Sequence, residues 1–82
     1  MNNYEIYAKV FMKTFNIERD KLKQLKYQEI DEWDSVGHME LVSELEDAFD
    51  IEFETDDIID FNSFEKGIEI LKKNYGVDIL GE

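Results

Sequence analysis

Apolar residues recur at intervals of three and four in three windows of this chain, and no other feature of the sequence constrains the fold as strongly. Residues 3–15, 35–49 and 64–74 each show this spacing, which predicts three amphipathic helices. The chain has no proline and only four glycines, a composition that also favours helices. The residues at helical spacing are Tyr4, Tyr7, Val10, Phe11 and Phe15; His38, Leu41, Val42, Leu45, Ala48 and Phe49; and Phe64, Ile68, Leu71 and Tyr75.

Polar residues at the expected boundaries indicate where the helices begin. A side-chain oxygen at a helix start accepts a hydrogen bond from an otherwise unpaired backbone N–H. Asp34 or Ser35 can cap the second helix in this way, and Ser63 can cap the last one. Thr55 is in position to cap a further short helix at about residues 56–61.

Residues 16–34 lack helical periodicity, which predicts a long loop with one short helical turn near residues 19–24. Loops of this length are often functional. We expect its scattered apolar residues to pin it to the core. The predicted fold is therefore all-α: a single domain spanning residues 1–82, built as a small bundle of three main helices and one short helix, with a long loop between the first two.

The charge is concentrated in the middle of the chain. The net charge is −12, and residues 29–62 contain 14 acidic residues and no Lys or Arg. This excess of acid argues against binding to nucleic acid or to anionic membrane surfaces, since both attract basic residues. A block of one sign can steer a basic partner or can serve solubility alone. With no apolar run long enough to cross a membrane and no signal-peptide pattern, we expect a cytoplasmic protein.

The residue inventory gives little support for catalysis or metal binding by the chain itself. It has no cysteine, which excludes disulfides and thiolate chemistry, and His38 is its only histidine. Ser35 and His38 are three residues apart at a helix start and could touch, but an isolated pair without an oxyanion hole is a weak nucleophile. No calcium loop or glycine-rich phosphate loop is present. We therefore predict no catalytic residue and no resident metal ion.

The segment from Trp33 to Val42 is the strongest candidate for a functional site. It places the Ser35 hydroxyl where a loop ends and an amphipathic helix begins. Free N–H groups and the helix dipole favour a negative group at such a position. Asp34 beside it could help to hold a divalent cation during a phosphoryl-type transfer. From these residues alone, a plain helix cap is the more common explanation of the serine.

This segment resembles the acyl carrier protein family, which includes the related peptidyl carrier domains. The resemblance covers about residues 29–75, whereas the first helix fits only in length and pattern. Together with the short chain and its acidity, the similarity identifies Ser35 with the family's attachment serine. The matching runs are Asp34-Ser35-Val36, Glu40-Leu41-Val42, Leu45 to Phe53, Asp56-Asp57-Ile58 and Phe61 to Phe64.

The resemblance implies that Ser35 carries 4′-phosphopantetheine, installed from coenzyme A with Mg²⁺ by holo-acyl carrier protein synthase or another phosphopantetheinyl transferase, with Asp34 part of that site. The arm ends in a thiol that holds an acyl or aminoacyl group as a thioester. Implied partners are loading ligases and acyltransferases with basic patches, and the carrier would act as a monomer. The residues of this chain that are predicted to contact these partners are Asp34, Val36, Met39, Glu40, Glu44, Glu46 and Asp47.

Two further features follow from the resemblance. The acyl chain of a carrier can lie between helices, and the residues that could line such a space, or simply form the core, are Met39, Leu41, Leu45, Ile58 and Phe61. The sequence also departs from the fatty-acid-type pattern at Trp33, Val36, Gly37, His38, Ser43, Glu54 and Thr55. Trp33 before Asp-Ser is more similar to stand-alone carriers of specialised biosynthetic pathways.

Three functions therefore stay open at the level of sequence. The first is a carrier of acyl groups, or alternatively of aminoacyl or peptidyl groups, on Ser35. The second is a non-catalytic acidic adaptor in which Ser35 is only a helix N-cap. The third is a minimal hydrolase that uses Ser35 and His38.

Overall fold

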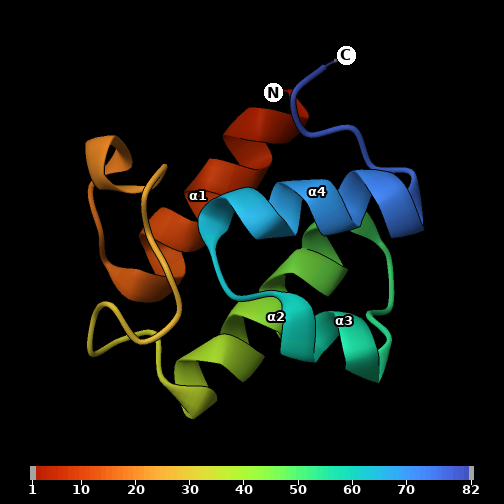
Figure 1. Cartoon of the computed structure of the whole chain (residues 1–82). Helices are drawn as coiled ribbons and strands as arrows, with labels where there is room; N and C mark the ends of the chain where they lie inside the picture. Colours follow the sequence, from red (N-terminus) through yellow and green to blue (C-terminus); the bar gives the residue numbers. More distant parts are fainter. Residues whose placement is uncertain (1, 82) are drawn as a thin grey trace.

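A computed structural model describes residues 2–81, and within them the chain is all-helical, as predicted (Figure 1). The bounds of α1 and α2 match the helices predicted from apolar periodicity, and α4 ends one residue later than predicted. The loop between α1 and α2 contains one short 3-10 turn. The elements are α1 (Asn3–Phe15), the 3-10 turn (Arg19–Lys21), α2 (Ser35–Phe49), α3 (Thr55–Asp60) and α4 (Phe64–Tyr75).

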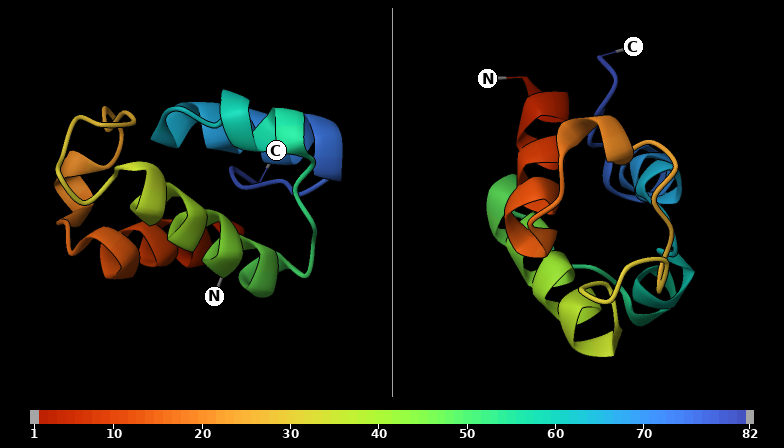
Figure 2. Two further views of the ribbon diagram at one scale, coloured as in Figure 1. Left: turned by 90° about the horizontal axis from the view of Figure 1, so that it is seen from below. Right: turned by 90° about the vertical axis from the view of Figure 1, so that its left-hand side faces the viewer.

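The four helices enclose one core. Helices α1 and α2 pack side by side, and α3 and α4 lie across from them (Figure 2). The long loop closes one end of the bundle, the end at which α2 begins. Near the opposite end, the Asn3 side-chain amide donates a hydrogen bond of 3.1 Å to the Asp78 carbonyl, so the tail after α4 is fastened to the start of α1.

Aromatic side chains dominate the core, with Phe11 at their centre. The ring of Phe11 lies 5.0 Å from Phe64 and 5.5 Å from Trp33 between centroids, and all three side chains are buried. Edge-to-face and tilted pairs of this kind add stability beyond the area they bury. The Tyr7 hydroxyl donates a hydrogen bond of 2.7 Å to the Phe64 carbonyl, and its burial raises the pKa of Tyr7 well above the usual value. The core therefore binds α1, the loop and α4 into one unit.

Ser63 caps the start of α4 as predicted and Asn2 caps the start of α1, but one predicted cap is not formed. The side-chain oxygens of Asn2 and Ser63 each accept a hydrogen bond from the backbone N–H three residues later, at 2.8 and 2.9 Å. The prediction that Thr55 caps a helix at 56–61 is wrong. Thr55 is already helical, and the extended residue before α3 is Glu54, whose side chain makes no capping hydrogen bond.

The loop between α1 and α2 is fixed to the rest of the bundle by both side chains and backbone. Leu22, Leu25 and Trp33 are buried, as expected for residues that pin the loop to the core. Backbone hydrogen bonds join it to the connection between α3 and α4, where the Tyr27 N–H donates to the Asn62 carbonyl at 2.9 Å, and to the start of α4, where the Phe64 N–H donates to the Leu25 carbonyl at 3.0 Å. These contacts make the loop one end of the domain. Its helical turn, Arg19–Lys21, is shorter than the predicted residues 19–24.

The second half of α2 differs from expectation at one position. Ala48 shares the helical spacing of the apolar residues but is exposed. The face of α2 that packs on α1 is centred on Leu41, Val42 and Leu45, all buried, and Ala48 lies beyond its edge.

Within residues 2–81, no helix is long and apolar enough to cross a membrane.

Candidate functional site

Ser35 is the first residue of α2, and the residue before it closes the helix end. Asp34 has an extended backbone, and its Oδ1 atom accepts a hydrogen bond of 2.8 Å from the Gly37 N–H. Asp34 is thus the N-cap, and the hypothesis that Ser35 serves only as the cap is wrong. The Ser35 side chain is exposed, and its hydroxyl makes no hydrogen bond within the described part of the chain.

The helix end beside Ser35 has backbone N–H groups without partners in the part of the chain that the structure describes. The His38 N–H donates to the Asp34 carbonyl at 2.8 Å, and the Gly37 N–H is taken by the Asp34 side chain. The backbone N–H groups of Ser35 and Val36 have no partner among residues 2–81. Unpaired N–H groups and the helix dipole both favour a negative group at this end. The site therefore suits a phosphate ester on the Ser35 hydroxyl.

Gly37 allows the loop to pack tightly against the first turn of α2. A Cβ atom at this position would lie 1.9 Å from the Glu32 carbonyl oxygen and 3.3 Å from Cε1 of Phe15. The first distance is far below any van der Waals contact, and backbone oxygen cannot move aside as a flexible side chain can. Gly37 departs from the family's fatty-acid-type pattern, and this close approach is its structural reason.

His38 is held by two hydrogen bonds and does not pair with Ser35. The Trp33 Nε1–H donates to His38 Nδ1 at 2.9 Å, and His38 Nε2 lies 2.7 Å from the Ile58 carbonyl oxygen. An indole nitrogen only donates and a carbonyl only accepts, so the imidazole is neutral with its proton on Nε2. Neither ring nitrogen is left to take a proton from a serine. The Ser35–His38 pair that a minimal hydrolase would need is therefore not formed.

Apolar side chains are exposed beside Ser35 on α2. Val36 and Met39 are 67% and 52% exposed. With Ser35, Glu40 and Ser43 they line a shallow depression of about 500 Å³. Large apolar side chains exposed together on a small domain often mark a binding surface.

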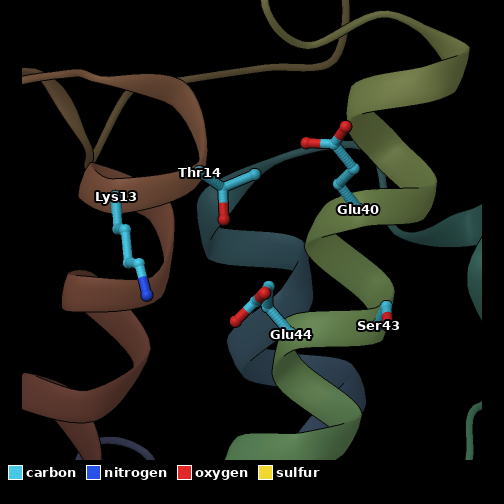
Figure 3. A pocket seen from close by; sticks show the side chains of 5 residues that line it. All are labelled: Lys13, Thr14, Glu40, Ser43 and Glu44. Carbon is cyan, nitrogen blue, oxygen red and sulfur yellow. The ribbon is translucent and has the colours of Figure 1, made fainter.

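The predicted acidic contacts are not equivalent. Glu40 and Glu44 point from α2 toward α1 and, with Lys13, Thr14 and Ser43, line a second depression of about 330 Å³ (Figure 3). Asp47 is exposed one turn further along α2.

Glu46 is only partly exposed and supports the chain after α2. Its Oε2 atom accepts a hydrogen bond of 2.8 Å from the Phe53 N–H, which holds the connection between α2 and α3. Sequence spacing alone could not separate Glu46 from its neighbours, because the bond depends on how the connection folds back.

The residues that could line an acyl space are divided between the core and the surface. Leu41, Leu45 and Phe61 are fully packed in the core. Met39 is exposed, and Ile58 is half-buried. The depression beside Ser35 is lined by Met39 and by none of the other four. In residues 2–81, no cluster of three His, Asp or Glu side chains is arranged to hold a metal ion.

The comparison with known proteins decides the family. The chain is 33% identical to the acyl carrier protein of Lactobacillus johnsonii, in an alignment that covers 90% of this chain and 98% of that protein. The chain belongs to the acyl carrier protein family. No family model matches it, and no solved structure matches it significantly.

Family membership and geometry agree on a general carrier role. The two hydrogen bonds of His38 are the part of this site that sequence reasoning missed. The available signal was the joint occurrence of Trp33, Gly37 and His38, three of the four departures from the fatty-acid-type pattern between residues 33 and 38.

Proposed function

We propose that Ser35 is the attachment site of 4′-phosphopantetheine and that the protein carries acyl or aminoacyl groups as thioesters on this arm. The observation that carries the proposal is the position of Ser35 in a member of this family. Its exposed hydroxyl is the first side chain of α2, follows the capping Asp34 directly and has no hydrogen-bond partner among the described residues. The chain has no cysteine, so the thiol of the arm supplies the only thioester-forming group.

The residues next to Ser35 have different roles in the proposed attachment. Asp34 holds the helix end through Oδ1, which leaves its other oxygen to face a divalent cation brought with coenzyme A. The N–H groups of Ser35 and Val36 face the phosphate ester. Gly37 keeps the loop close to the helix, so the serine is presented at a fixed corner of the domain.

The partner surface is the exposed side of α2. Val36 and Met39 supply apolar contacts, and Glu40, Glu44 and Asp47 supply negative charge toward basic patches on a phosphopantetheinyl transferase, loading ligases and acyltransferases. Exposed ion pairs are worth about 0–1 kcal/mol each, so several of them speed encounter without producing a tight complex. Salt-sensitive, short-lived binding suits a monomeric, non-catalytic carrier in the cytoplasm.

The cargo pathway is a specialised one. Trp33, Gly37 and His38 depart from the fatty-acid-type pattern, and their side chains and backbone form one connected structure beside Ser35. An aminoacyl or peptidyl carrier of the same fold is the alternative within this class. Loading assays with purified acyl- and aminoacyl-activating ligases distinguish the two.

Intact mass spectrometry tests the attachment. The protein is incubated with coenzyme A, Mg²⁺ and a broad-specificity phosphopantetheinyl transferase, next to Ser35→Ala and Ser43→Ala. Ser43 is a matched control because it is also an exposed serine on α2 and lines the same depression. We expect the parent chain and Ser43→Ala to gain one phosphopantetheine and Ser35→Ala to gain none. A folded parent chain that gains nothing would favour a plain acidic adaptor.

A further inference from the structure

A chain of two hydrogen bonds runs through His38 and joins three parts of the molecule. Trp33 is the last buried residue of the loop, His38 lies in the first turn of α2, and Ile58 belongs to α3. The bonds measure 2.9 Å on the indole side and 2.7 Å on the carbonyl side. Both are possible only for the neutral ring with its proton on Nε2.

Ser35 lies between the two residues that this chain connects. Trp33 precedes it by two residues and His38 follows it by three, so the bond between them closes a short ring of backbone around the serine. The indole and imidazole rings are nearly parallel, with 22° between their planes and 6.1 Å between centroids. Trp33 itself is wedged against Phe11 and Phe15 in the core. Trp33 thus anchors the turn that carries Ser35 to the core.

On its other side His38 reaches α3, a short helix with little burial of its own. Helix α3 has six residues, none of them fully buried, and no side-chain cap. The bond from His38 to the Ile58 carbonyl therefore holds α3 against the start of α2, next to the edge contact between the His38 and Phe61 rings at 6.0 Å.

We propose that His38 is a positioning residue for the modification of Ser35: it locks the serine-bearing turn and α3 into one relative orientation, so that a transferase meets a preformed surface. The inference rests on the proposed attachment at Ser35. His38 touches neither the reacting hydroxyl nor the phosphate, and it acts through Trp33 and Ile58.

Two substitutions of His38 each remove one of its two hydrogen bonds and keep the other. His38→Asn keeps an acceptor at the place of Nδ1 and loses the donor to Ile58. His38→Gln keeps a donor at the place of Nε2 and loses the acceptor for Trp33. Trp33→Phe removes the indole donor and keeps an aromatic ring in the core, and it is the second way to remove the Trp33 bond if His38→Gln folds poorly.

The experiment combines nuclear magnetic resonance with transfer kinetics on the full chain. In the parent protein, the ¹⁵N signals of His38 should show the Nε2–H tautomer. His38→Asn should leave the indole N–H resonance of Trp33, the single tryptophan, near its place and speed amide exchange in residues 55–60 about tenfold. His38→Gln and Trp33→Phe should leave that exchange near the parent rate, and His38→Gln should shift the indole resonance.

The kinetic outcome decides the role. Each variant should raise the KM for the carrier in phosphopantetheine transfer about three- to tenfold, the effect of one lost hydrogen bond, with kcat within twofold. An Nδ1–H tautomer, or an unchanged KM in variants whose resonances and exchange have changed, would overturn the inference. A parent chain that is never modified would instead refute the attachment at Ser35, while the tautomer and exchange results would still stand on their own.

Discussion

Helix α2, which carries the candidate site, and helix α3, which is hydrogen-bonded to its first turn, are held in place in different ways. Helix α2 has a side-chain cap, buries Leu41, Val42 and Leu45 and packs along α1. Helix α3 has no side-chain cap and no fully buried residue. It is fastened largely by polar bonds, from His38 to Ile58 and from Tyr75 to Asp57.

The difference implies that the two elements respond differently to substitution. Apolar burial and a cap make the start of α2 a fixed platform for Ser35. Helix α3 depends on a few hydrogen bonds, each worth about 0.5–1.5 kcal/mol, and can open locally without unfolding the core. For the modification proposed at Ser35, the first property is needed at the serine and the second is tolerated beside it.

The largest expected effect is at Trp33. Trp33→Ala removes a fully buried ring that packs on Phe11 and Phe15, and it should destabilise the domain by about 3–5 kcal/mol. Ile59→Ala on α3 is the control, because that side chain is mostly exposed, and it should change stability by less than about 0.5 kcal/mol. Urea titrations followed by circular dichroism measure both. Similar losses in the two variants would contradict the assigned packing.

Gly37→Ala should have the next largest effect. The new Cβ meets the Glu32 carbonyl oxygen, so the loop must shift at a cost of about 1–3 kcal/mol. Gly67→Ala is a matched clash elsewhere, against the Phe61 ring and the Tyr7 hydroxyl. Both should lower the melting temperature, but only Gly37→Ala should slow the transfer of phosphopantetheine to Ser35 at a temperature where both variants are folded. Equal slowing by the two would mean that the loop position does not matter.

Tyr75→Phe should loosen α3 selectively. The Tyr75 hydroxyl donates to Asp57 at 2.6 Å and accepts from the Glu54 N–H at 2.8 Å, and burial followed by the bond to Asp57 raises the pKa of Tyr75. Its loss should cost about 1 kcal/mol and speed amide exchange in residues 55–60, while exchange in residues 38–45 stays close to the parent rate. Tyr4→Phe is the control because no hydrogen bond of its hydroxyl is observed within residues 2–81. Parallel acceleration in both regions would show that α3 does not open on its own.

The last prediction concerns Asp34, where the loss of stability is no larger than that of Tyr75→Phe. Asp34→Ala removes the cap of α2 and should cost about 1 kcal/mol, whereas Asp34→Asn keeps a capping oxygen and should cost only a few tenths. If the carboxylate also faces the cation during transfer, both variants should be modified more slowly. Ser63→Ala, which removes the cap of α4, gives the cost of a lost cap without an effect on transfer. Modification of Asp34→Asn at the full rate would show that the charge of Asp34 plays no part in the transfer.

The sequence predicted those parts of the fold that depend on local patterns. Apolar spacing located α1 and α2 to the residue, and Ser63 marked the start of α4. Thr55 misled because several polar residues precede α3, and backbone geometry rather than residue type decides which of them is the cap.

The details of the site depend on contacts that local patterns do not contain. Asp34 and Ser35 are both good caps, so only the fold shows that the first one closes the helix and leaves the second exposed. The bond from His38 to Ile58 spans 20 residues, and the path of the connection through Phe53 determines it. His38 and Trp33 each had a plain role as core side chains, and their pairing became visible only in three dimensions.

Tandem mass spectrometry of the protein after treatment with coenzyme A, Mg²⁺ and a transferase tests the central claim most directly, because it assigns the added group to one residue. We expect a single phosphopantetheine, located on Ser35 and on no other hydroxyl. A group found on Ser43 or another exposed serine or threonine, or a correctly folded chain that acquires none, would contradict it.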